Sequence, residues 1–187
     1  GGVDTINQVD IAFARQRAGA VLQELVAALP DGTRQKVQAI PLFSDPTVGE
    51  VNAFAACDDQ GQPLMAVSDG LLEVMMNSAR FRAYDEVART QKLDAYIALV
   101  AKNFRPNQAL PRPGPGFVDP AFDLNPGKLA RQAELLDEQL AFVIGHELAH
   151  HHLGHTGCAN GGASPGVSVS DFGRLVSRAA PFLNQPN

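Results

Sequence analysis

The first apolar positions of the chain follow the period of an α-helix. Apolar side chains recur every three or four residues between about residues 6 and 29, and no proline interrupts them. The sequence Pro30-Asp31-Gly32 follows directly, and proline and glycine are the poorest residues in a helix interior. The pattern therefore predicts one long amphipathic helix that ends before residue 30.

Three short apolar segments come next, and each is typical of a β-strand. They cover residues 36–43, 51–55 and 63–67, with turn-forming residues between them. The sequence Asp58-Asp59-Gln60-Gly61 separates the last two segments and predicts a hairpin turn. We therefore expect a small, mostly antiparallel sheet.

Helical spacing returns after these strands. Asp69 can cap a helix that starts at Gly70, and neither glycine nor proline occurs again before residue 105, so this stretch predicts two helices or one kinked helix. Residues 105–127 contain six prolines, which excludes a regular element. They form either an ordered connector across the surface or a lid near an active cleft.

A last long helix is predicted from Asn125-Pro126 to residue 155, because asparagine is a good cap and proline suits the first turn. Gly145 lies within it and costs about 1 kcal/mol relative to alanine, so we expect a close packing neighbour there. Residues 156–168 predict a loop, and residues 171–180 predict a final helix. The chain is therefore expected to be α+β, with a small sheet packed on helices.

Composition narrows the class of protein. The 187 residues are 45% hydrophobic and 19% charged, which is typical of a soluble globular chain, and one domain over residues 1–187 is expected. The net charge of −5 and the lack of a basic cluster disfavour a nucleic-acid partner. No apolar run approaches the ~20 residues that cross a bilayer. A signal sequence removed before Gly1 stays open, because the first residues resemble a processed start.

The two cysteines, Cys57 and Cys158, allow two main interpretations. A disulfide between them would close a loop of about 100 residues, stabilise the fold by roughly 4–5 kcal/mol and imply an oxidising compartment. Two free thiols are the other main interpretation, and a thiolate that reaches a metal is a weaker third one.

The candidate metal-binding and catalytic residues lie in one short segment of the chain. All five histidines lie between residues 146 and 155, and His146-Glu147-x-x-His150 matches the H-E-x-x-H pattern of zinc hydrolases. Residues four apart share one helix face, so two imidazoles can bind one metal ion, with Glu147 beside it as a general base. The alternative without a metal site is a surface histidine cluster or a purification tag. The apolar flank at residues 140–144 favours a metal-site helix instead.

The chain resembles the HtpX-type and CAAX prenyl protease-type gluzincin peptidases, which include soluble periplasmic members. The resemblance covers roughly residues 45–156 and rests on three motifs in order. The motifs are Asn52-Ala53-Phe54-Ala55, the run Val67-Ser68-Asp69-Gly70-Leu71-Leu72, and the histidine run from His146 to His155 with its lead-in at residues 137–145.

This resemblance implies a zincin-like metallopeptidase domain with one Zn²⁺ per chain. His146 and His150 would bind the zinc, and Glu147 would be the base. The strand Asn52-Ala53-Phe54 would bind an extended substrate at the edge of the cleft. His155 lies about 180° from His146 on an ideal helix, so we expect it in a supporting or packing position behind the ligands. For His151 we favour exposure to solvent over a hydrogen bond to Glu147.

The chain departs from the family at the third zinc ligand, which the resemblance gives as a glutamate on a later helix. No glutamate follows Glu147, and Asp171 is the one carboxylate side chain beyond His150. Three explanations compete: the expected glutamate lies beyond Asn187 in a longer protein, Asp171 substitutes for it, or the site is incomplete by nature. The oxyanion donor is also unidentified.

These observations predict a zinc-dependent metalloendopeptidase that hydrolyses peptide bonds through a zinc-activated water, with Glu147 as the base. The alternative is a catalytically incomplete protein of the same fold that binds a peptide or protein. A third hypothesis is a zinc hydrolase that acts on another class of substrate. A periplasmic or secreted location is favoured, and a cytoplasmic one stays open.

Overall fold

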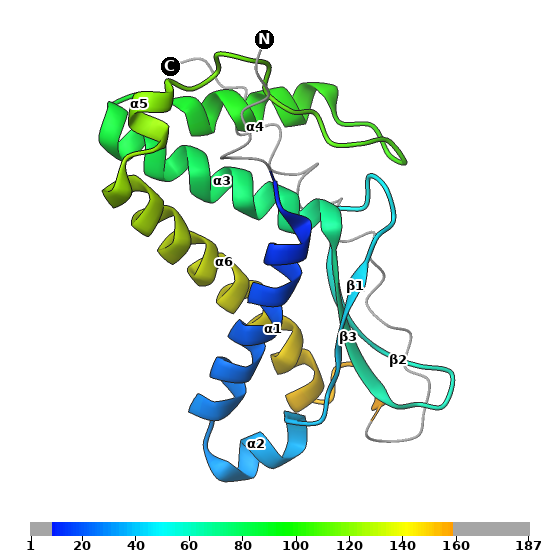
Figure 1. Ribbon diagram of the computed structural model, residues 1–187. Helices are drawn as coiled ribbons and strands as arrows, with labels where there is room; N and C mark the ends of the chain where they lie inside the picture. Colours follow the sequence, from blue (N-terminus) through cyan, green and yellow to red (C-terminus); the bar gives the residue numbers. More distant parts are fainter. Residues whose placement is uncertain (1–8, 159–187) are drawn as a thin grey trace, which may run out of the picture.

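The computed structural model describes residues 9–158, and the helix predicted over residues 171–180 lies outside this range. The elements of the described residues alternate between helices and a small sheet (Figure 1). In chain order they are α1 Ile11–Ala28, α2 Asp31–Val37, β1 Leu42–Asp45, β2 Ala53–Cys57, β3 Pro63–Ser68, α3 Asp69–Ala88, α4 Lys92–Asn103, α5 Pro120–Asp123 and α6 Pro126–His152.

The first helix is confirmed, and the first strand is shorter than predicted. Asp10 caps α1 by accepting a hydrogen bond of 3.0 Å from the Phe13 N–H. Residues 36–37, predicted as strand, instead belong to α2. This short helix starts because the Pro30 carbonyl accepts from two following N–H groups, while the Asp31 carboxylate favours the positive helix end.

The sheet is mixed, so the prediction of a mostly antiparallel sheet is wrong. Its strand order is β1-β3-β2, with β3 parallel to β1 and antiparallel to β2. The connection between β1 and β2 leads the chain to the far side of β3, which leaves β1 running in the direction of β3. The hairpin turn between β2 and β3 is confirmed, because the Asp58 carboxylate accepts from the Gln60 and Gln62 N–H groups at 2.8 Å.

The helical stretch after the sheet divides into two helices, as the sequence allowed. Ser68, rather than Asp69, caps α3 by accepting from the Leu71 N–H. Arg89 ends α3 in the left-handed conformation, with φ of 56°. The Asp85 carboxylate then accepts from two backbone N–H groups at the start of α4, which fixes the turn between the helices.

The proline-rich stretch is anchored on α3 and α4, and it contains the short helix α5, which the sequence analysis did not predict. Arg112 forms an ion pair of 2.6 Å with Glu73, and the Asp119 N–H donates to the Tyr84 hydroxyl at 3.0 Å. Leu110 is buried. Figure 1 shows the first part of this stretch beside the connection between β1 and β2, where the backbone of Gln108 approaches Gly49, and α5 near the start of α6. The histidine end of α6 lies far from both. These contacts are those of an ordered connector.

The core forms where α6 crosses α1, α3 and the sheet (Figure 1). The buried residues of α6 after its first turns are spaced by four, at Leu136, Leu140, Ile144 and Leu148. The first three pack in the main cluster, and Leu148 packs with Met65 in a second one. Gly145 has no neighbour within 4 Å of an added Cβ, so the expected close contact there is wrong.

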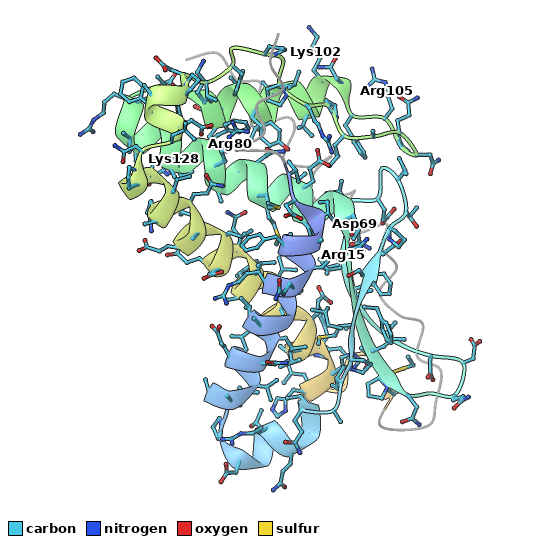
Figure 2. All side chains as sticks on the ribbon, in the orientation of Figure 1. Arg15, Asp69, Arg80, Lys102, Arg105 and Lys128 are labelled. Carbon is cyan, nitrogen blue, oxygen red and sulfur yellow. A yellow bond between two sulfur atoms is a disulfide. The ribbon has the colours of Figure 1, made fainter. Side chains whose placement is uncertain are left out.

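A buried ion network joins the start of α6 to α3 and α5. The Asp123 carboxylate accepts from Arg80 and from Lys128, each at 2.6 Å, and the Asp123 and Lys128 side chains are at most 1% exposed. Arg80 and Lys128 lie near each other where these helices meet (Figure 2). Burial opposes ionisation of Asp123, but the hydrogen bonds from Arg80 and Lys128 outweigh it, so the pKa of Asp123 is lowered.

We expect Asp123→Asn to destabilise the fold by about 3 kcal/mol at neutral pH, because Arg80 and Lys128 each lose an ion-pair partner at a buried position. The lowered pKa means that ionised Asp123 contributes its full stability above about pH 4, and that this contribution is lost as the pH falls further. Urea unfolding of both proteins between pH 3 and pH 7 measures the difference. A difference that stays constant over this range would contradict the ionic role.

Candidate metal centre

The two histidines of the H-E-x-x-H pattern converge on α6. His146 Nε2 and His150 Nε2 lie 3.0 Å apart. Two imidazole nitrogens on one tetrahedral zinc lie about 3.3 Å apart, because each Zn–N bond is about 2.0–2.1 Å. The pair therefore fits a single zinc ion with an adjustment of a few tenths of an ångström. Burial, followed by the nearby charges of His146 and His155, lowers the pKa of His150, which favours the neutral, metal-binding form.

Glu147 lies between the helix and the edge strand. It is partly buried, and the backbone of Ala55 in β2 is near enough to its carboxylate to influence its pKa. Burial raises the pKa of Glu147, and His146, the Ala55 backbone and His151 oppose that shift. The carboxyl group therefore lies near the imidazoles of His146 and His151, and its role as a base stays a prediction.

The pairing of β2 shows which of its backbone groups point outward. The Asn52 carbonyl accepts from the Ser68 N–H, and the Gln62 carbonyl accepts from the Asp58 N–H, so residues with even numbers on β2 pair with β3. Ala53, Ala55 and Cys57 therefore direct their N–H and C=O groups away from β3. The influence of the Ala55 backbone on the pKa of Glu147 agrees with this parity.

Of the three residues predicted to bind substrate, Ala53 is the one with outward backbone groups. Asn52 and Phe54 direct theirs toward β3. The Asn52 side chain is nevertheless unusual, because it is buried and its Nδ2 has no hydrogen-bond partner among the described residues. Sequence reasoning missed Ala55, although its parity with Ala53 would have placed its backbone at the same edge.

His151 holds the end of α6 against the sheet. Its Nε2 donates to the Leu64 carbonyl at 2.8 Å, and its Nδ1 lies 3.1 Å from the Thr156 hydroxyl. In the neutral ring, the hydroxyl donates to Nδ1. We expected His151 to face solvent or to form a hydrogen bond with Glu147, and both expectations were wrong. The side chain instead contacts β3, which packs against this side of α6.

Helix α6 ends at His152 rather than at residue 155, and a Schellman motif ends it. Gly154 has φ of 74°, its N–H donates to the His151 carbonyl, and the His155 N–H donates to the His150 carbonyl. This reversal brings His155 back, so that its Nδ1 lies 3.1 Å from His150 Nδ1. The expectation from an ideal helix does not apply, and Gly154 was the signal in the sequence.

A disulfide joins the edge strand to the segment that follows α6. Cys57 at the end of β2 is bonded to Cys158, with Cα atoms 5.6 Å apart. Of the interpretations left open by the sequence, the structure has the disulfide. The disulfide fixes the Cys57 end of β2 to the segment after α6, and it does not hold the Ala53 end of the strand.

The remaining ligands of the centre are not found in the part of the chain that is described. Among residues 9–158, no group of three or more His, Cys, Asp or Glu side chains is arranged to hold a metal ion. Asp171, weighed as a third ligand, lies outside the described residues. The roles predicted for His146, Glu147 and His150 therefore stay predictions, supported by their geometry.

A helix with the H-E-x-x-H pattern, packed beneath an edge strand, is the arrangement of a metallopeptidase. Comparison with known families agrees, because the model of Peptidase family M48 matches residues 20–169. The chain belongs to this family, as its resemblance to HtpX-type and CAAX protease-type enzymes implied, and its kind of function is that of a metallopeptidase. Comparisons with curated proteins and with solved structures gave no match.

No helix within residues 9–158 is both long enough and apolar enough to cross a bilayer.

Proposed function

We propose that this chain is a zinc-dependent metalloendopeptidase, with His146 and His150 as zinc ligands and Glu147 as the general base. The observation that carries the proposal is the 3.0 Å approach of the two Nε2 atoms beside a carboxylate that reaches the edge strand. A third protein ligand would come from outside the described residues, as zinc peptidase sites have three.

The substrate in this proposal is an extended peptide or protein segment. It would add to the outward edge of β2, where the Ala53 N–H and C=O and the Ala55 C=O offer backbone hydrogen bonds. Such binding recognises the backbone of the substrate rather than its side chains. This mode of recognition is compatible with an endopeptidase.

Zinc, when bound, supplies a Lewis acid that lets water lose a proton near neutral pH. Glu147 accepts that proton on its carboxylate and returns it to the leaving amine. The backbone of Ala55 lies near this carboxylate, so the base is close to the strand that would hold the substrate.

The disulfide bears on where the enzyme works. Disulfides persist in oxidising compartments and are rare in the cytosol. With Cys57 and Cys158 bonded, we favour a periplasmic or secreted location.

The direct test of the metal site is His150→Ala. We expect it to weaken zinc binding by at least about 100-fold, which exceeds the usual cost of losing a residue behind a ligand. Competition with a chromogenic zinc chelator measures the affinity. His152→Ala is the matched control, since His152 is an exposed residue of the same helix end. Equal affinity of the His150→Ala variant and the wild-type chain would refute the ligand assignment.

A further inference from the structure

The ring of His150 has close histidine neighbours at both of its nitrogen atoms. Its Nε2 lies 3.0 Å from His146 Nε2, and its Nδ1 lies 3.1 Å from His155 Nδ1. The rings of His150 and His155 are tilted by 63°, with centroids 5.2 Å apart, so the second contact is an edge contact between nitrogens rather than a stack. The three histidines form one chain of contacts that starts at the predicted ligands.

The chemistry of a ligand histidine assigns the proton in the second contact. A neutral imidazole that binds a metal through Nε2 carries its proton on Nδ1, and that N–H needs an acceptor. His155 Nδ1 is within hydrogen-bond distance of it. For this atom to accept, His155 must carry its own proton on Nε2.

We propose that His155 is a positioning residue that holds His150 in its metal-binding tautomer and orientation. The inference rests on the proposed function, because it requires His150 to be a ligand. It goes further in naming the atom, the direction of the hydrogen bond and the tautomer of each ring. His155 does not touch the zinc in this proposal and acts through His150.

The backbone builds this contact. In a Schellman motif, the second residue beyond the helix end returns to the residue three positions before the cap. These two positions are His155 and His150, and their backbones are joined by the hydrogen bond of 2.9 Å from the His155 N–H. Gly154, at φ of 74°, has the conformation that allows the reversal. The acceptor is thus placed by local structure that forms with the helix itself.

The test is the zinc affinity of three variants, measured on the whole chain by chelator competition. His155→Ala should weaken zinc binding by about 10–100-fold, the usual cost of losing such a partner. His155→Asn should stay within a few-fold of the wild-type affinity, because its Oδ1 is bonded to Cγ as Nδ1 of histidine is and can accept the same hydrogen bond. His152→Ala, which removes a neighbouring exposed histidine, should leave the affinity unchanged.

A second readout separates positioning from stability. Nitrogen-15 NMR of the zinc-loaded chain should show His150 protonated on Nδ1 and His155 protonated on Nε2. Thermal unfolding of the metal-free chains should hardly change in the His155→Ala variant, because His155 is exposed.

The outcomes also distinguish this inference from the proposed function. Wild-type affinity in His155→Ala, with His150→Ala impaired, would overturn the positioning role and leave the zinc site intact. Wild-type affinity in both variants would overturn the ligand assignment and this inference with it. The opposite tautomer of His155 in the zinc-loaded chain would also overturn the inference.

Discussion

Glu147→Gln is expected to lower the rate of peptide hydrolysis by about 10³–10⁴-fold, while the chain keeps its zinc. Glutamine has nearly the shape of glutamate, so it should fit the same position on α6. It cannot take a proton from water, however. The loss should therefore appear in kcat, with zinc content and fold unchanged. Initial rates on a quenched fluorescent peptide library and zinc analysis of the same samples measure both quantities.

Glu138→Gln is the matched control, because Glu138 is an exposed residue earlier on the same helix, with 66% of its side chain accessible. Its rate should equal that of the wild type. Undiminished hydrolysis by Glu147→Gln would sink the assignment of the base. A wild-type chain that binds these peptides and zinc but never cleaves them would instead favour the alternative of a peptide-binding protein with a peptidase fold.

Removing the disulfide is expected to have the largest effect on stability. The bond joins residues 101 positions apart, and a loop of this length corresponds to about 4.7 kcal/mol in the chain-entropy model. Domains of this size have total stabilities of about 5–15 kcal/mol. The double variant Cys57→Ser, Cys158→Ser should therefore unfold about 10–15 °C lower than the oxidised wild type. Calorimetry of both proteins measures the shift.

The same wild-type protein in a thiol reductant is the control, and it should unfold near the temperature of the double variant. At low temperature the variant should still bind zinc, because the hydrogen bond between His151 and the Leu64 carbonyl holds the end of α6 to β3 without the disulfide. An unfolding temperature equal to that of the oxidised wild type would show that the bond does not constrain the unfolded chain.

Sequence reasoning located the helix with the H-E-x-x-H pattern because the residues that indicate it are close together in the chain. The i, i+4 spacing of His146 and His150 fixes their proximity on any helix, and the cap at Asn125 fixes where that helix starts. The hairpin turn at Asp58 is equally local. These features were confirmed as structure, while the catalytic roles attached to them stay predictions.

Features that depend on the packing of segments far apart in the chain could not be predicted from the sequence. Nothing in β1 alone indicates that it runs parallel to β3, and nothing in His151 indicates that the Leu64 carbonyl lies 2.8 Å away. The contact of His155 with His150 was different, because Gly154 marks the helix end and the motif then places both residues. The predicted position of His155 opposite His146 was wrong because the predicted helix extended to residue 155 instead of ending at His152.

The two faces of α6 bear on how this protein can change over time. The residues that hold it in the core, from Leu136 to Leu148, recur every four positions, while His146 and Glu147 lie off that buried stripe. Replacement of a predicted ligand or base would therefore leave the core packing untouched. A single substitution could therefore remove the proposed chemistry from a chain that keeps its fold and its strand edge.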